Sequence, residues 1–350
     1  MKLGVHIGYW GMGLTSADQL EIVQEAERLG YDSVWAAEAY GSDAPTILSW
    51  VAAQTTQIDI GSAIFQIPGR TPANCAMTAA TLDSLSGGRF RLGLGVSGPQ
   101  VSEGWHGVRF DKPLERTREY VEIVNMALRR EKVKYQGKHY VLPLPDGPGK
   151  ALQLTVHPVR DHIPTYLASV GPKNLELTGE CFDGWLAIFY SPEHAKESMS
   201  HIEAGRAKVG KTMEGFDVVP SMPMIVGDDQ RACADTIRWY AALYIGGMGS
   251  REKNFYNALA VRMGYEAAAK EVQDLYLDRK YDEAAAAVPF EFLEQTALLG
   301  TKEQIAEKMQ ALAASGVTTL TITPGGGSPE EQKAGLRTAV EALELSGCGS

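Results

Sequence analysis

The chain has 350 residues, of which 44% are hydrophobic and 22% are charged, the balance of a soluble globular protein with material for a large core. Its formal net charge of −10 argues against a general affinity for nucleic acid. No window approaches the roughly 20 apolar residues that span a bilayer, and the beginning predicts a strand rather than a signal peptide. We therefore expect a cytoplasmic protein without a membrane partner.

The four cysteines are widely spaced, and neither a CxxC pair nor a metal-ligand spacing occurs among them. We expect no metal site and, in the cytoplasm, reduced thiols.

The first third of the chain alternates short apolar runs with amphipathic helical patterns. Ser16 is expected to cap the first helix, and Gly30 to end it. Strands that alternate with helices indicate a parallel sheet. Strands are predicted over residues 3–7, 33–37, 58–64 and 90–94, and helices over 16–29, 45–55 and 72–84.

The second half continues this alternation, which brings the total to eight strands, each followed by a helix. We therefore predict an α/β fold of the (β/α)8 TIM barrel type, with residues 1–350 as a single domain. A doubly wound open sheet is the alternative, disfavoured by the count and by the lack of GxGxxG after the first strand. The further strands are predicted over 164–169, 184–188, 218–226 and 318–323.

Two stretches interrupt the period. Residues 132–145 alternate around Gln136-Gly137, which predicts a β-hairpin inserted before the fifth strand. Residues 241–289 are mostly helical and form an insertion between the seventh and eighth strands. In a barrel that position lies beside the ligand-binding face, so the insertion is expected to act as a lid or a dimer surface.

The stretch 87–107 places a buried strand directly before a polar, glycine-rich, aromatic loop. The loop contains Ser97, Gly98, Glu103, Trp105 and His106, residues unsuited to a packed core. Ligands of α/β proteins bind at the carboxyl ends of strands, so this loop predicts a site. The alternative is an ordinary surface loop.

Five segments together resemble the luciferase-like flavin and deazaflavin superfamily, in its coenzyme F420-dependent branch. The resemblance covers essentially the whole chain and is closest to an actinobacterial and mycobacterial subfamily of F420-dependent oxidoreductases. It implies a barrel with an insertion after the seventh strand, a flavin-type ring across the mouth, and a homodimer. The segments are WAAEAYGSD at 35–43, GSAIFQIPGRTP at 61–72, TLDSLSGGRFRLGLG at 81–95, SGPQVSEGWHG at 97–107 and YLASVGPKN at 166–174.

The resemblance assigns several residues to the ring. It implies a non-prolyl cis peptide between Ala63 and Ile64 behind the ring; the alternative is an ordinary strand end. It implies that Glu38 contacts the deazaflavin edge, where the alternative is an exposed carboxylate or a helix-capping partner. Ser97 and Gly98 are expected near the deazaflavin.

The segment after the fifth strand is expected to meet the phosphate and acidic tail of F420, as in relatives. Backbone N–H groups at a helix N-terminus favour phosphate, and Lys173 adds a positive charge. Arg70 and Arg251 are weaker candidates for the same task, and a helix start with a solvated lysine is the alternative. The segment comprises Ser169, Val170, Gly171, Pro172 and Lys173.

The chain departs from the family at Ala39, where several F420 dehydrogenases have a catalytic histidine. His106 or Glu103 could supply the missing acid or base, His106 because an unperturbed imidazole has a pKa of about 6.5. The alternative for His106 is a packed, hydrogen-bonded ring. His6 could point into the barrel mouth, but a position in the core is favoured for it. An aromatic wall is predicted from Tyr9, Trp10, Tyr40 and Trp105.

The sequence thus predicts an F420-dependent oxidoreductase that transfers a hydride between C5 of the deazaflavin and a small organic substrate. A carbonyl, an alcohol and an activated alkene all remain open as substrates. One alternative is an FMN-dependent monooxygenase that uses O2 on the same barrel. The other is a protein that binds F420 without turnover.

Overall fold

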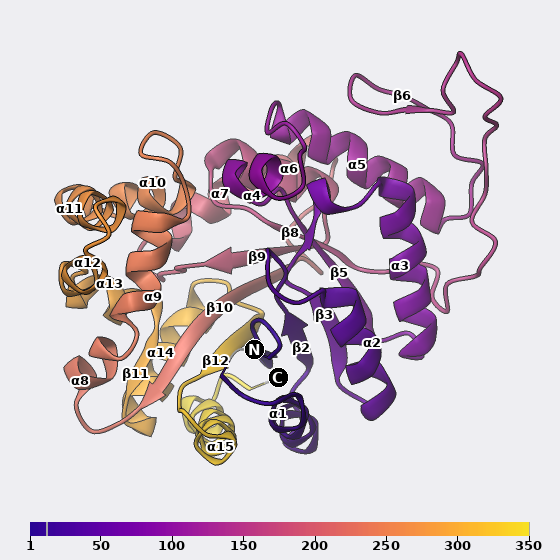
Figure 1. The fold of residues 1–350 in the computed structure, drawn as a ribbon. Helices are drawn as coiled ribbons and strands as arrows, with labels where there is room; N and C mark the ends of the chain where they lie inside the picture. The colour runs from indigo at the N-terminus through magenta and orange to yellow at the C-terminus, as the bar shows by residue number, and fades with distance from the viewer. Residues whose placement is uncertain (12, 350) are drawn as a thin grey trace.

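Parallel strands form a closed barrel in the computed structural model, which describes residues 1–11 and 13–349 (Figure 1). Neighbouring strands hydrogen-bond in chain order, and β12 pairs with β1 to close the ring. This confirms the predicted (β/α)8 barrel. Its eight strands are β1 (Lys2–His6), β2 (Ser33–Ala36), β3 (Asp59–Ser62), β5 (Phe90–Gly95), β8 (Thr165–Ala168), β9 (Gly184–Ile188), β10 (Asp217–Val226) and β12 (Thr319–Pro324).

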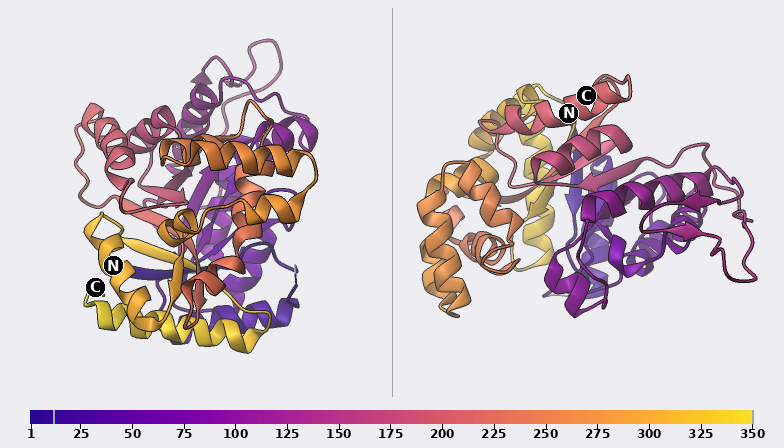
Figure 2. Two further views of the ribbon diagram at one scale, coloured as in Figure 1. Left: turned by 90° about the vertical axis from the view of Figure 1, so that its left-hand side faces the viewer. Right: turned by 90° about the horizontal axis from the view of Figure 1, so that it is seen from above.

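Helices cover the outside of the barrel (Figure 2). The first begins after Thr15, which forms a capping box with Asp18, so the expected cap at Ser16 was one residue late. In the described residues no helix combines the length and the apolar composition needed to cross a membrane. The outer helices are α1 (Ser16–Arg28), α2 (Ala44–Gln54), α3 (Pro72–Leu85), α5 (Pro113–Leu128), α6 (Pro172–Cys181), α7 (Ala195–Lys208), α14 (Lys302–Ala314) and α15 (Pro329–Ser346).

Two aromatic rings fill the middle of the barrel. Trp35 and Tyr166 meet edge to face with 5.2 Å between ring centroids, and both side chains are buried. They fit because neighbouring strands carry glycine beside them. A Cβ at Gly61 would lie 2.3 Å from the Trp35 ring, and one at Gly184 would lie 2.4 Å from the Tyr166 ring. The interior of the barrel is therefore filled by side chains.

Charged groups close the end of the barrel at which the strands begin. Arg91 of β5 is buried and pairs with Asp32 at 2.6 Å and Asp59 at 2.7 Å. The hydroxyl of Tyr166 donates to Asp217 at the start of β10. These residues lie at or near the amino ends of their strands, so they form a floor opposite the ligand-binding end.

The predicted hairpin is confirmed. Strands β6 (Tyr135–Gln136) and β7 (Val141–Leu142) pair antiparallel and project from the barrel (Figure 1). Glu119 of α5 holds its turn by accepting three successive backbone N–H groups, those of residues 138–140, at 2.8–3.0 Å.

The helical insertion is confirmed, but its predicted bounds of 241–289 are too narrow. It begins at Gln230 and its last helix ends at Thr296, because the helical pattern continues on both sides. A second hydrophobic cluster, which includes Phe292, fills the insertion. The assignment of residues 1–350 to a single domain stays a prediction. The helices of the insertion are α8 (Gln230–Asp235), α9 (Arg238–Ala242), the π-helix η2 (Leu243–Gly247), α10 (Phe255–Arg262), α11 (Glu266–Leu277), α12 (Tyr281–Ala286) and α13 (Phe290–Thr296).

A short strand that the sequence analysis missed ties the insertion back to the barrel. Strand β11 (Leu298–Gly300) pairs with the last residues of β10, whose first residues pair with β9. Strand β10 has ten residues and extends beyond its pairing with β9, and β11 pairs with the part of β10 that extends beyond β9. Three residues are too few for a periodic signal.

Candidate active site

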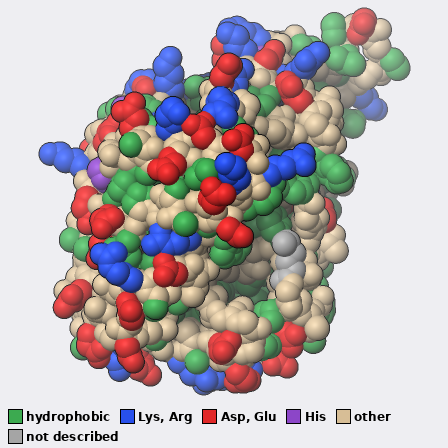
Figure 3. Space-filling model, turned by 60° about the vertical axis from the view of Figure 1, so that its left-hand side comes forward, with side chains coloured by type: hydrophobic (Ala, Val, Ile, Leu, Met, Phe, Trp, Pro, Cys, Tyr) green, Lys and Arg blue, Asp and Glu red, His purple; other side chains and the backbone are tan. Residues whose placement is uncertain are grey.

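The carboxyl ends of the barrel strands open to one side, and the insertion lies beside them because it joins β10 to β12. Arg262 of α10 donates to the Val170 carbonyl after β8 at 2.9 Å. Phe255 of α10 lies 6.1 Å from Phe110, between ring centroids. A hollow with hydrophobic side chains in its wall is visible on the insertion side of the molecule (Figure 3).

The strand end behind the predicted ring has the expected backbone. The peptide between Ala63 and Ile64 is cis. Ile64 packs over Gly95, where a Cβ would lie 2.2 Å from its Cδ1 atom. The chain then forms β4 (Phe65–Gln66) and one 3-10 turn (Ile67–Gly69), between the strand predicted to end at residue 64 and the helix predicted to begin at residue 72. Contact between this peptide and a bound ring stays a prediction.

His6 ends β1 close to this peptide. Its Nδ1 accepts the backbone N–H of Gly8 at 3.1 Å. Burial lowers the pKa of the imidazole to about 4, although a hydrogen bond with the Ala63 backbone opposes the shift. His6 is therefore neutral at pH 7 and supports the end of β3 rather than carrying charge.

Glu38 and Arg70 form a bidentate ion pair at the mouth. The guanidinium nitrogens lie 2.5 and 2.6 Å from the two carboxylate oxygens. The same oxygens accept the backbone N–H groups of Ala44 and Gln66, each at 3.2 Å. Four donors saturate a carboxylate, so Glu38 acts first as a capping and ion-pair partner. Arg70 also donates to Asp43 at 3.1 Å, so its charge is internally compensated.

The predicted phosphate segment opens α6. Gly171 is the N-cap, no side chain caps the helix, and a Cβ at Gly171 would meet nothing within 4 Å. The hydroxyl of Ser169 instead points inward to Thr178 at 2.8 Å. Lys173 is exposed, and no hydrogen bond or ion pair is recorded for its ammonium group in the described part of the chain. Arg251, the other distant candidate, pairs with Asp274.

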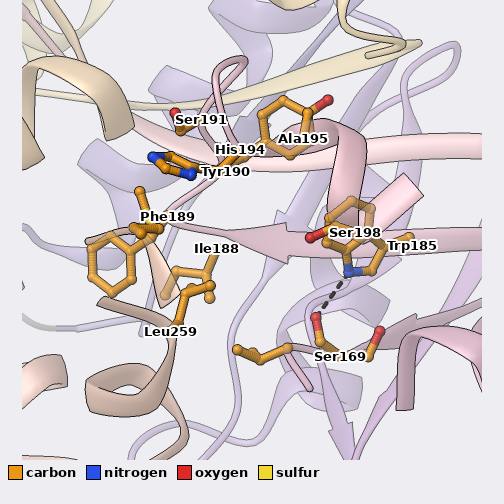
Figure 4. A pocket seen from close by; sticks show the side chains of 12 residues that line it. Ser169, Trp185, Ile188, Phe189, Tyr190, Ser191, His194, Ala195, Ser198 and Leu259 are labelled. Carbon is orange, nitrogen blue, oxygen red and sulfur yellow. Dashed lines mark hydrogen bonds between the residues drawn. The ribbon is translucent and has the colours of Figure 1, made fainter. Parts of the chain in front are cut away.

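Two adjoining hollows lie beside this segment, between α6, α7 and α10. The first is bounded by Val170, and by Phe189 and His194, which Figure 4 shows. The second adds His201 and Arg262. The sequence analysis missed His194, His201 and Arg262; the position of the first two shortly after the sixth strand was the available signal.

Glu103 and His106 lie on or after a short helix, α4 (Pro99–Gly104), where a loop was predicted. Glu103 is exposed and accepts the backbone N–H of Phe110 at 3.0 Å. His106 packs over Gly69, whose Cβ would lie 3.2 Å from its Cε1. Its Nε2 is buried, and within residues 1–11 and 13–349 it has no hydrogen-bond partner.

The loop between β5 and α4 reaches the insertion. Ser97 has a positive φ of 57°, and Gly98 is the N-cap of α4. A Cβ at Gly98 would lie 3.9 Å from the carbonyl oxygen of Met248. This loop therefore borders the mouth, and its contact with a deazaflavin stays a prediction.

The four residues of the predicted aromatic wall do not form one surface. Trp105 is 67% exposed, and Trp10 meets Trp50 of α2 edge to face at 5.4 Å. Tyr9 packs over Gly41 and, like Tyr40, faces the insertion. Among the residues that the structure describes, no group of three or more His, Cys, Asp or Glu side chains is placed to hold a metal ion.

The fold and the site together define a (β/α)8 barrel whose ligand site lies at the carboxyl ends of the strands, beside a helical insertion. The family model of luciferase-like monooxygenases matches residues 5–319, so the chain belongs to this family.

Individual relatives extend this result. Rv3520c of Mycobacterium tuberculosis, whose name assigns it provisionally as a coenzyme F420-dependent oxidoreductase, is 43% identical over 343 residues, 96% of this chain and 99% of the relative. The coenzyme F420-dependent tetrahydromethanopterin reductase of Methanopyrus kandleri superposes with a TM-score of 0.81 at 21% identity, covering 98% of this chain and 97% of that one. An F420-dependent secondary alcohol dehydrogenase, solved with an F420-acetone adduct, gives 0.77 at 19% identity, covering 99% and 98%. At these identities the two structures establish the fold alone.

The ion pair at the mouth generates a stability prediction. Arg70→Met should lower the free energy of unfolding by about 3 kcal/mol, because it leaves the buried Glu38 carboxylate without its cation. The double variant Glu38→Gln/Arg70→Met should recover part of this loss. Chemical denaturation measures both, and Arg129→Met, which removes an exposed pair with Glu131, should cost less than about 1 kcal/mol. Equal losses for Arg70→Met and Arg129→Met would contradict the assignment.

Proposed function

We propose that this protein is an F420-dependent oxidoreductase. The carrying observation is the 43% identity, over nearly the whole length of both chains, to a relative named as such an enzyme. When bound, F420 supplies or accepts the hydride, and the protein contributes position, electrostatics and exclusion of water. The reaction joins the cofactor to a small organic substrate.

The residues present fit this cofactor. The N-terminus of α6 offers backbone donors that no side chain caps, and a hollow adjoins it. Lys173 and Arg262 supply positive charge on the same side, which an acidic tail requires in a protein of net charge −10. We propose that residues 169–173 hold the phosphate through backbone groups and Lys173, and that Ser97, Gly98, Ala63 and Ile64 border the ring.

The proton-transfer group remains a proposal. Glu103 is exposed and already accepts a backbone hydrogen bond, whereas His106 has a buried Nε2 without a recorded partner in the described residues. We therefore favour His106 over Glu103. Ala39 itself offers no acid or base, so the group must come from elsewhere in the site.

We further propose a cytoplasmic homodimer. The resemblance to the F420-dependent branch supports the homodimer.

Cofactor titration tests the proposed function. F420 fluorescence should be quenched on binding, and FMN at the same concentrations should show no saturable binding. Tight FMN binding with negligible F420 binding would instead support the O2-dependent monooxygenase. Detectable turnover of F420 on any substrate excludes a purely F420-binding role.

Lys173→Ala should weaken F420 binding about three- to tenfold, because it removes one charge-assisted contact with the phosphate or tail. The fluorescence titration reports the dissociation constant. Lys150→Ala, an exposed lysine in the loop after the hairpin, is the matched control and should leave it unchanged. Equal affinity of the Lys173 variant and the wild type would remove Lys173 from the site.

His106→Ala should lower kcat by about 10²-fold, the scale of a lost general acid or base, with little change in F420 affinity. The measurement is F420 turnover on a panel of carbonyl and enone test compounds. His157→Ala, on the loop after the hairpin, controls for loss of a histidine. Full activity of His106→Ala would return this residue to a packing role.

A further inference from the structure

Tyrosines from the barrel and the insertion gather over the mouth. Tyr240 and Tyr244 are 4.8 Å apart, and Tyr244 and Tyr256 are 4.9 Å apart, between ring centroids. Tyr9 and Tyr40, from the loops after β1 and β2, lie near Tyr244. Tyr244 helps to raise the pKa of Tyr9, and Tyr40 helps to raise the pKa of Tyr244. We name these five residues the tyrosine cluster.

Phe189 forms the base of the tyrosine cluster. Its ring centroid lies 5.6 Å from that of Tyr244 and 6.4 Å from that of Tyr256. It directly follows β9 and has a positive φ of 50°, a conformation that a bulky residue adopts only where its surroundings impose it. Phe189 also bounds the first hollow beside the predicted phosphate segment. The tyrosine cluster therefore adjoins the proposed cofactor site.

The cluster lines a recess rather than a packed core. Burial is the main cause that raises the pKa of Tyr9, Tyr244 and Tyr256, the last to about 12. Yet all three side chains belong to residues that keep solvent-accessible surface. A group that is largely surrounded by protein but still accessible to solvent lies in a concave part of the surface.

Aromatic rings make up the known walls of this recess. Among the described residues, the ionisable side chains that contribute to the raised pKa values of Tyr9, Tyr244 and Tyr256 are other tyrosines. At the nearby ion pair, Glu38 and Arg70 already compensate each other. An ionised ligand would lose its hydration here without gaining a counter-charge, which is costly. The recess therefore selects against phosphorylated or carboxylated compounds.

Tyr244 is placed to recognise an oxygen atom. It lies on the π-helix η2, a type of helix that is frequent at functional sites. A tyrosine phenol is protonated at neutral pH, and burial raises the pKa of Tyr244 further, so its hydroxyl can donate a hydrogen bond.

We propose that the tyrosine cluster is the substrate site, and that it takes an uncharged compound with an apolar, ring-sized body and a carbonyl or hydroxyl oxygen. The Tyr244 hydroxyl donates to that oxygen, and the rings of Phe189 and Tyr256 pack against the body. This inference rests on the proposed function and adds the class of substrate. The competing explanation is that the tyrosines only join the insertion to the barrel.

Two probes of matched shape test the charge selection. Acetophenone is uncharged and benzoate is an anion, while both carry one aromatic ring. Saturation-transfer NMR on the protein saturated with F420 should show binding of acetophenone and at least tenfold weaker binding of benzoate. Equal binding of both probes, or binding of neither, overturns the proposal.

Conservative variants test the residue assignment. Tyr244→Phe keeps the ring and should raise the dissociation constant of acetophenone about three- to tenfold, because one hydrogen bond is lost. In turnover with reduced F420, the same variant should raise KM for acetophenone more than it lowers kcat. Tyr135→Phe, on the hairpin, is the matched control. If both variants bind acetophenone as the wild type does, the tyrosines serve only to join the insertion to the barrel.

A gain of function gives an independent readout. Tyr40 is 62% exposed at the edge of the cluster, so Tyr40→Lys should be tolerated and should bring a cation to the recess. Benzoate binding should then rise several-fold; no rise would count against a recess at this place. F420 quenching, measured on each variant, separates the two proposals. If the wild-type protein does not quench F420 fluorescence, the proposed function is refuted. If it quenches F420 fluorescence but does not bind acetophenone in preference to benzoate, only the tyrosine recess is refuted.

Discussion

The edge-to-face contact of Trp35 with Tyr166 fills the inside of the barrel and determines where a ligand can bind. Eight strands enclose too little space for two large rings unless neighbouring positions give up their side chains, and Gly61 and Gly184 do so. Below the rings, Arg91 and its carboxylates close the floor. A ligand can therefore enter only from the carboxyl ends of the strands.

The two sides of the mouth are built on different principles. On the side of β2 and β3, the Glu38–Arg70 pair satisfies its own charges and fixes the loops, so this wall is complete without a ligand. On the side of β8 and β9, the helix start at Gly171 is uncapped and hollows adjoin it. A wall with unsatisfied donors and open space is suited to an anionic group, whereas a wall of saturated groups is suited to the face of a ring.

The sequence predicted the barrel because strands buried on both faces leave continuous apolar runs, and each helix has local start and stop residues. It failed where the signal was short or distant in sequence. Strand β11 has three residues, and α4 has six. The partner of Glu38 lies 32 residues away, and the inward turn of Ser169 depends on Thr178. Residue type predicted which side chains are polar, but only the fold shows which of them are already paired.

This difference decides how a strongly acidic protein can hold an acidic cofactor. Of the cations proposed from sequence, Arg70 pairs with Glu38 and Asp43, and Arg251 pairs with Asp274, so neither adds net positive charge to the mouth. Lys173 remains, and Arg262 joins it from the insertion. Arg262 also donates to the Val170 carbonyl and so holds α10 of the insertion against the barrel. In the proposed site, the side chain that attracts the cofactor tail would therefore also position the insertion that carries Tyr244 and Tyr256.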